Sequence, residues 1–239
     1  MTSDPLSREQ IVRVAIELLD ADGVDGLSMR RLAGRIGSGA TSIYWYVRSK
    51  DELTALAADA AFGEIELPDP ARVGWRTAAG RMAHGLRATI LRHPWLPQVI
   101  AAHPAFGPMT ARHAEHAFAV FQEAGFAGTD LDWATNALFA FVYGTALGEA
   151  TTTNLRERLR RDGVDEEQYI NELIDKHRAA AAPFPRLRER YEASTRADQD
   201  SARDRSFEFG LRTVLDGLEA RLVPAPGPPG GLAAEPGSP

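Results

Sequence analysis

Apolar residues recur three and four positions apart along most of the chain, which is the spacing of one face of an α-helix. The first such run ends near Gly23, and its apolar face consists of Ile11, Val14, Ala15, Leu18 and Leu19. Ser7 and Gln10 form a capping box in front of this run. No hairpin dipeptide lies between alternating apolar and polar residues. The pattern therefore predicts an all-α fold.

Two short helices are predicted to follow. Ser28 can cap a helix of about two turns, which a glycine at Gly37 ends. The inward residues of this helix are Leu32, Ala33 and Ile36. A further short helix is predicted over about residues 40–47. In it Ile43 and Val47 are four apart and can face inward together, whereas the neighbouring aromatic residues mostly cannot.

A fourth helix is predicted to begin at a second capping box, formed by Ser49 and Glu52. Its buried side consists of Leu53, Leu56, Ala57 and Ala60. Two prolines then break the pattern within residues 66–72, so we expect a small domain over 1–66 and a larger one over 67–222. Helices of the larger domain are predicted at about 75–92, 95–102, 107–124, 130–153, 155–161, 166–181, 185–194 and 203–222. The Pro- and Gly-rich residues 223–239 are expected to form a disordered tail.

Composition narrows the possible classes of protein. Cysteine is absent from the 239 residues, which excludes disulfides, thiolate metal sites and cysteine nucleophiles. No stretch approaches the roughly 20 consecutive apolar residues of a membrane span. The first ten residues, MTSDPLSREQ, have neither the basic nor the apolar region of an export signal. We expect a cytoplasmic protein with no membrane anchor, and no motif requires a metal or a cofactor.

Positive charge is concentrated in one short segment. Residues 26–50 hold four arginines, one lysine and no acidic residue, a charge of +5, whereas the whole chain carries −6. The rest of the chain therefore carries −6 − 5 = −11. A polyanion would be attracted to this segment and repelled elsewhere, as expected for a DNA-binding module on an acidic body. The alternative is a chance cluster of arginines on a solvated face.

Two short helices joined by a glycine-bearing turn describe a helix-turn-helix, whose second helix lies in the major groove of DNA. If Ile43 and Val47 anchor that helix, Thr41, Ser42 and residues 44–46 lie outward. Hydroxyl groups and apolar edges there can meet bases, and tyrosine phenols can donate to phosphates.

A lysine follows at the start of the next helix. Lys50 lies at the positive end of that helix dipole, a placement that costs roughly 0.3–1 kcal/mol and that a phosphate would relieve. The alternative interpretation is an indifferent surface lysine.

The segment SREQIVRVAIELLDADGVDGLSMRRLAGRIGSGATSIYWYVRSKDELTAL resembles the DNA-binding domain of TetR-family transcriptional regulators. In register with the family pattern are Gly23, Leu27, Arg30, Leu32, Ala33, Gly37, Tyr44, Trp45, Val47, Lys50 and Leu53. The resemblance implies base contacts by Arg30, Thr41 and Ser42 and apolar contacts by Ala40 and Trp45. It implies phosphate contacts by Ser28, Ser38, Tyr44, Tyr46 and Lys50. Tyr46 stands where the family usually has a histidine.

The remaining chain resembles the tetracycline repressor more weakly, through HPWLPQVIAAHP, FGLRTVLDGLEARL and Trp75. This resemblance implies a pocket for a small molecule and a homodimer held by two helices of each subunit, here about 130–153 and 203–222. The second helix carries a continuous apolar stripe of Phe207, Leu211, Val214, Leu215 and Leu218, a pattern that is also typical of an intramolecular core. The two DNA-binding domains of a dimer, about 34–36 Å apart, must also be held together by the rest of the protein.

Candidate pocket residues follow from this resemblance and from helical facing, each with ordinary core packing as the alternative. They are Met82, Leu86, Ile100, His103, His113, Thr135, Asn136, Phe139 and Tyr143. The polar members are the more informative, because a buried polar group needs a partner. Ile100 stands where the tetracycline repressor has a histidine that helps to hold a magnesium-bound drug. We therefore expect some other apolar or aromatic effector.

Two other function classes compete with a regulator. An enzyme is disfavoured, because GRIGSG lies between two helices without the ending of a phosphate-binding loop, and RHAEH lacks a metalloprotease pairing. A helical carrier or scaffold explains residues 70–222 equally well but leaves the basic segment unexplained. We expect a dimeric DNA-binding regulator, most simply a repressor of a palindromic operator. Its effector would release it by binding the non-DNA state more tightly, by about 1–3 kcal/mol.

Overall fold

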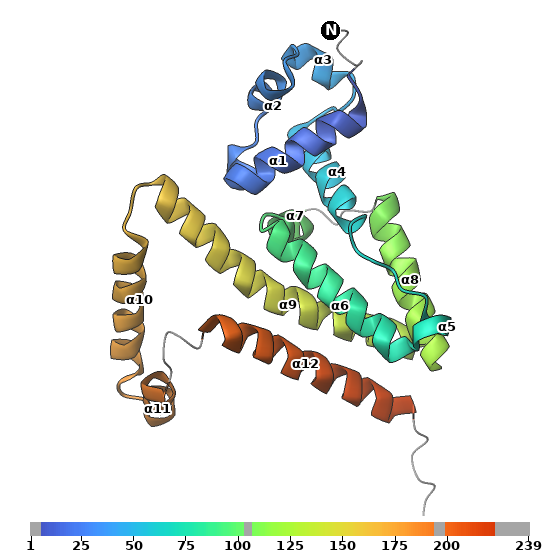
Figure 1. Ribbon diagram of the computed structural model, residues 1–239, viewed down its shortest axis with the longest axis vertical. Coiled ribbons are helices and arrows are strands. Elements are labelled where there is room, and N and C mark those ends of the chain that lie inside the picture. Colours follow the sequence, from blue (N-terminus) through green and yellow to red (C-terminus); the bar gives the residue numbers. More distant parts are fainter. Residues whose placement is uncertain (1–5, 103–106, 194–198, 223–239) are drawn as a thin grey trace, which may run out of the picture.

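The computed structural model describes residues 6–102, 107–193 and 199–222, and every regular element within these ranges is a helix (Figure 1). The amino-terminal group consists of α1 (Arg8–Gly26), α2 (Met29–Ile36), α3 (Ala40–Tyr44) and α4 (Lys50–Phe62). The body consists of α5 (Pro70–Val73), α6 (Trp75–Arg92), α7 (Leu96–Ala102), α8 (Pro108–Ala124), α9 (Gly128–Arg161), α10 (Glu166–Ala181), α11 (Pro185–Ala193) and α12 (Gln199–Leu222). The all-α prediction is confirmed, whereas the expected tail lies outside the described residues.

The amino-terminal helices begin where the sequence predicts. The hydroxyl oxygens of Ser7, Ser28 and Ser49 accept hydrogen bonds from backbone N–H groups three residues later, at 3.1, 3.2 and 3.0 Å. Gly37 ends α2 in the left-handed conformation at φ 77°, which favours glycine. The fully buried side chains of the group, those with 0 % exposure, include Ile11, Ala15, Leu32, Ile43, Val47 and Leu53. These residues join the four amino-terminal helices in one core.

Two predicted helix boundaries are wrong. α3 ends at Tyr44 rather than near residue 47, because the N–H groups of Tyr46 and Val47 both bond to the carbonyl of Ile43 in a closing turn. The segments 130–153 and 155–161 are one continuous helix, α9. Residue 154 does not interrupt it, because Asn154 keeps helical backbone and donates from its side chain to the carbonyl of Pro94 at 2.9 Å.

The body is built on α6, α8 and α9, and α12 lies along α9 (Figure 1). The apolar stripe of α12 is not an outward face. Phe207, Leu211, Leu215 and Leu218 are buried within the chain, against α9 and α6, so this stripe is intramolecular core. Gly210 permits the close packing of α12 on α9, because a Cβ there would lie 2.3 Å from the ring of Phe141.

The amino-terminal group is fixed to the body by a polar cluster around the buried ring of His93. Asp20 of α1 accepts hydrogen bonds from the indole N–H of Trp95 at 2.6 Å and from Nδ1 of His93 at 2.7 Å. Nε2 of His93 faces the carboxylate of Glu64 at 3.3 Å. Burial lowers the pKa of His93, but the hydrogen bond to Asp20 and the charge of Glu64 outweigh it and raise that pKa. The two parts of the molecule therefore share an ionic contact.

No helix among the described residues is long and apolar enough to cross a membrane.

Candidate nucleic-acid interface and effector cavity

The turn after α3 places three consecutive aromatic residues in solvent. The side chains of Tyr44, Trp45 and Tyr46 are 50 %, 86 % and 40 % exposed, whereas Ile43 and Val47 on either side are fully buried. The predicted division between anchoring and outward residues is therefore confirmed. Because Ile43 and Val47 carry the packing, the aromatic rings are free to contact another molecule.

Hydroxyl groups accompany these rings. Thr41 and Ser42 are exposed on α3, and Ala40 at its first position is half-buried. Ser28 caps α2 by accepting from the N–H of Arg31, which leaves its hydroxyl hydrogen available to a phosphate. Ser38 is placed differently from the expectation. Its Oγ is buried with no hydrogen-bond partner among the described residues, so in this conformation it cannot reach a phosphate.

The basic side chains of this segment divide into two kinds. Arg31 is structural, because it pairs with Asp22 at 2.6 Å and donates to the carbonyl of Gly26 at 2.6 Å, which ties α2 to the end of α1. The other four are Arg30, Arg35, Arg48 and Lys50, and they have no ion-pair partner among the described residues. Lys50 is the first residue of α4, as predicted. Unpaired cations beside exposed aromatic rings suit a polyanionic partner.

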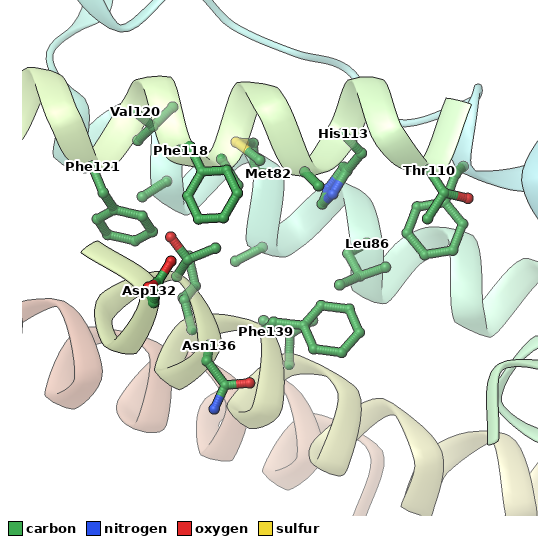
Figure 2. A pocket seen from close by; sticks show the side chains of 18 of the residues that line it. Met82, Leu86, Thr110, His113, Phe118, Val120, Phe121, Asp132, Asn136 and Phe139 are labelled. Carbon is green, nitrogen blue, oxygen red and sulfur yellow. The ribbon is translucent and has the colours of Figure 1, made fainter. Parts of the chain in front are cut away.

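A cavity of about 450 Å³ lies in the body, between the end of α4, α6, α7, α8 and α9 (Figure 2). Seven of the predicted pocket residues line it: Met82, Leu86, Ile100, His113, Thr135, Asn136 and Phe139. Tyr143 does not. Its hydroxyl donates to the carbonyl of Pro97 at 2.9 Å, and it borders a different hollow near the end of α1, because its face of α9 meets α7. His103 lies outside the described residues.

Several lining residues were not among the candidates. Phe62 comes from the last turn of α4, in the amino-terminal group, and no local pattern marks it as a cavity residue. Phe118 and Phe121 belong to the face of α8 that also carries His113, Ala114 and Ala117, on which lining residues recur three and four positions apart. That helical spacing is the signal that could have identified them.

His113 is the polar group most deeply set in the cavity wall. Its Nε2 is buried and has no hydrogen-bond partner among the described residues, and its ring meets that of Phe62 edge-on, with centroids 5.5 Å apart. Burial, helped by the neighbouring His116, lowers the pKa of His113 to about 4. The imidazole is therefore neutral at pH 7. His116 faces elsewhere and contacts the carbonyl of Pro68 at 2.9 Å, so the two histidines do not converge on a metal.

One carboxylate links α4 directly to the cavity wall. Asp59, only 8 % exposed, accepts hydrogen bonds from the N–H of Thr110 at 2.8 Å and from its hydroxyl at 2.9 Å. It thereby caps the positive end of α8. Gly107 leaves the necessary room, because a Cβ there would lie 2.1 Å from Cγ of Asp59. A shift of α8 would therefore also displace α4 through these hydrogen bonds.

Two family models match the chain. Residues 11–57 match the family described as "Bacterial regulatory proteins, tetR family", and residues 67–222 match "Tetracyclin repressor-like, C-terminal domain". The chain belongs to the TetR family of transcriptional regulators. Regulators of the TetR family are in general DNA-binding proteins without enzymatic activity.

Two curated relatives and one solved structure illustrate the TetR-family likeness. A transcriptional regulator of Saccharopolyspora erythraea is 36% identical over 184 residues, which cover 77% of each chain. The transcriptional repressor DrrR1 of Streptomyces coeruleorubidus is 31% identical over 221 residues, 91% of this chain and 79% of the repressor. ActR of Streptomyces coelicolor, crystallised with actinorhodin, has a TM-score of 0.73 at 27% identity, covering 92% of this chain and 98% of ActR.

Proposed function

We propose that this regulator is a repressor that binds a palindromic operator as a homodimer and leaves it when a small aromatic or apolar molecule enters the cavity of the body. The observation that carries the proposal is the surface around α3, where exposed Tyr44, Trp45 and Tyr46 stand beside unpaired cations. The relative DrrR1 is a transcriptional repressor, which supports the sign of the effect. The binding of actinorhodin by ActR supports an aromatic effector.

On the DNA side we propose that α3 enters the major groove. Thr41, Ser42 and Arg30 then face base edges, while Ala40 and Trp45 make apolar contacts. The phosphates are held by Ser28, Tyr44, Tyr46 and Lys50. The exposure of these side chains supports the assignment. Ser38 takes part only if the turn around it rearranges on binding.

For the dimer we propose an interface formed by the outward faces of α9 and α12. α9 exposes Trp133 at 63% and Leu147 at 41%, and α12 exposes Phe209 at 74%. Between them lie small residues at helical spacing, among them Ala137, Ala140, Gly144, Gly148, Thr213 and Gly217, all of them exposed. Apolar patches with small residues allow helices to approach closely, and a symmetric pair of such faces would form a four-helix bundle.

We further propose how occupancy of the cavity reaches the DNA-binding helices. Asp59 and Phe62 of α4 both touch α8, which lines the cavity, and α4 begins directly after the α3 turn. An effector that displaces α8 therefore moves α4 and changes the separation of the two copies of α3. Release requires that the effector favours the non-DNA state by about 1–3 kcal/mol, and DNA weakens effector binding by the same amount.

We also propose that DNA binding and effector binding belong to separate domains. Residues 1–66 form the DNA-binding domain, and 67–222 form the effector-binding and dimerisation domain. Binding alone accounts for the function, with no catalytic step. A protein that binds a bacterial operator works where the chromosome lies, so we place it in the cytoplasm.

The decisive experiment is selection of bound fragments from random duplex DNA by the full-length protein, followed by titration of the recovered site over a salt series. We expect a palindrome, two protein copies per site by analytical ultracentrifugation, and an affinity that falls steeply with salt because several phosphates are neutralised. Recovery of no preferred sequence, with a salt-insensitive signal, would favour a helical carrier instead. The variant Trp133→Glu tests the dimer separately. Analytical ultracentrifugation should show only monomers of this variant, and its binding to the operator should be abolished.

A further inference from the structure

The wall of the cavity limits the charge of what can bind there. Most of the lining is aliphatic or aromatic, and no lysine or arginine is among the lining residues that the structure describes. Asp132 contributes a carboxylate at the edge. An anion buried here would have no counter-charge, which is strongly unfavourable in an apolar environment. The cavity therefore selects against anionic molecules.

The two threonine hydroxyl groups of the wall offer only acceptors to a bound molecule. The hydroxyl of Thr110 already donates to Asp59 at 2.9 Å, and that of Thr135 donates to the carbonyl of Leu131 at 2.9 Å. Each of these oxygens can therefore only accept from a bound molecule, as can a carboxylate at Asp132. A ligand that forms hydrogen bonds with these oxygens must therefore bring its own donor.

His113 marks where that donor belongs. Its Nε2 is a buried polar atom without a partner among the described residues, and it lies in the wall beside Phe62. A neutral imidazole carries an acceptor nitrogen and a donor nitrogen, so it can complete a hydrogen bond without burying a charge. Leaving such an atom unpaired costs free energy that a correctly placed ligand hydroxyl recovers.

We propose that the effector is an uncharged polycyclic aromatic molecule with a free hydroxyl group, and that this hydroxyl forms a hydrogen bond with Nε2 of His113. The proposal rests on the assignment of this cavity as the effector site. In Figure 2, His113 and Thr110 lie towards one end of the cavity, and Phe118 and Phe121 lie towards the other. The rings of the effector pack against Phe118 and Phe121 while its hydroxyl reaches His113. An analogue without the hydroxyl is rejected because Nε2 stays unpaired.

Three probes with the same ring system test the proposal: 9-phenanthrol, phenanthrene and phenanthrene-9-carboxylate. Each is titrated into the full-length protein without DNA, with binding followed by fluorescence. We expect 9-phenanthrol to bind about tenfold more tightly than phenanthrene, and the carboxylate to bind most weakly. Tightest binding of the carboxylate, equal binding of the other two, or no binding of any of the three would overturn the proposal.

Variants of His113 then locate the preference. His113→Phe keeps an aromatic ring but removes the nitrogen, so it should abolish the tenfold preference while phenanthrene binds as before. His113→Gln restores a hydrogen-bonding group and should recover part of the preference. His116→Phe removes a histidine from the same helix outside the cavity and should change nothing, with circular dichroism melts confirming that each variant is folded. A preference that survives in His113→Phe would refute the role of His113.

The outcome is separable from that of the proposed function. Probe binding is measured without DNA, so a protein that prefers 9-phenanthrol but ignores DNA would retain this inference and lose the repressor. A protein that binds its operator but shows no preference among the probes would lose only this inference.

Discussion

The surface around α3 and the cavity of the body use the same residue types in opposite ways. Around α3 the aromatic rings point into solvent, with Trp45 86 % exposed, and the same segment carries hydroxyl groups and cations that have no ion-pair partner among the described residues. In the cavity the aromatic rings point inward, cations are absent from the described lining, and the one deeply set ionisable group, His113, is neutral. Local charge and the exposure of the side chains, rather than residue type, therefore decide which class of partner each region can bind.

The two regions also differ in how the fold supports them. Serine caps on α1, α2 and α4 and a few buried side chains hold the amino-terminal helices, all within about 60 residues of chain. The cavity instead combines Phe62 of α4 with residues of α6, α7, α8 and α9. Asp59 joins the regions by capping α8 from α4. The experiments below either separate the two regions or test this connection.

The largest effect is expected from removing the proposed phosphate contacts of the surface around α3. The double variant Tyr44→Ala/Lys50→Ala should bind the operator about 100-fold more weakly, and the slope of log affinity against log salt should fall by about 1 for the lost cation. Fluorescence anisotropy with the selected operator measures both. Arg178→Ala, an exposed arginine on α10, is the matched control and should leave affinity unchanged. An unaltered affinity in the double variant would remove α3 from the interface.

The pH dependence of the free energy of unfolding tests the electrostatic difference between the two regions. His113 has a folded-state pKa of about 4, below its value of 6.5 in the unfolded chain, so the unfolded state binds more protons between these values and stability falls as pH drops. Chemical unfolding of His113→Phe between pH 6.5 and 4 should show a loss smaller by about 2 kcal/mol than in the wild type. Identical pH profiles would mean that His113 is not held neutral.

His93 provides the opposite case within the same experiment. Its pKa is raised, so its contribution to stability is full below pH 6.5 and is lost as pH rises through the folded-state value. His93→Gln should therefore flatten the profile above pH 6.5, where His113→Phe has no effect. A flattening below pH 6.5 would contradict this assignment.

Filling the cavity should weaken effector binding without changing the affinity for the operator. Ala117→Phe places a ring in the lining of α8, so 9-phenanthrol should bind at least tenfold more weakly, while operator affinity stays as in the wild type. Ala111→Phe, on the exposed side of the same helix, controls for the added ring. Loss of operator binding in Ala117→Phe alone would indicate that the cavity region also supports the DNA-binding state.

The smallest effect is expected at the connection between the regions. Asp59→Asn replaces a charged cap of α8 by a neutral one, so the free energy of unfolding should fall by about 1 kcal/mol. The ratio of operator affinities without and with 9-phenanthrol should move towards one, because α8 no longer moves α4 as firmly. Asp69→Asn weakens the cap of α5 outside the cavity and should leave that ratio unchanged. A full effector response in Asp59→Asn would place the connection elsewhere.

Prediction from sequence succeeded where the interactions are local. Ser28 and Ser49 precede their helices by one residue, and Ile43 and Val47 are both fully buried although α3 ends before Val47, so capping and apolar spacing were sufficient. It left open whether the apolar stripe that includes Phe207 is intramolecular core or dimer interface, because periodicity shows that a face is buried but not which surface covers it. The burial of the Oγ of Ser38 could not be predicted for a related reason, since its position in a turn does not reveal what covers it.

The amino-acid sequence by itself determined that the chain is helical, where most helices begin, and that one short basic segment exposes aromatic rings. It could do so because helix caps, glycine turns and apolar spacing act over a few residues. Only the tertiary structure decided that Phe62 lines the cavity, that Tyr143 does not, and that Asp59 caps α8. These contacts join residues far apart along the chain, and their geometry depends on how whole helices pack.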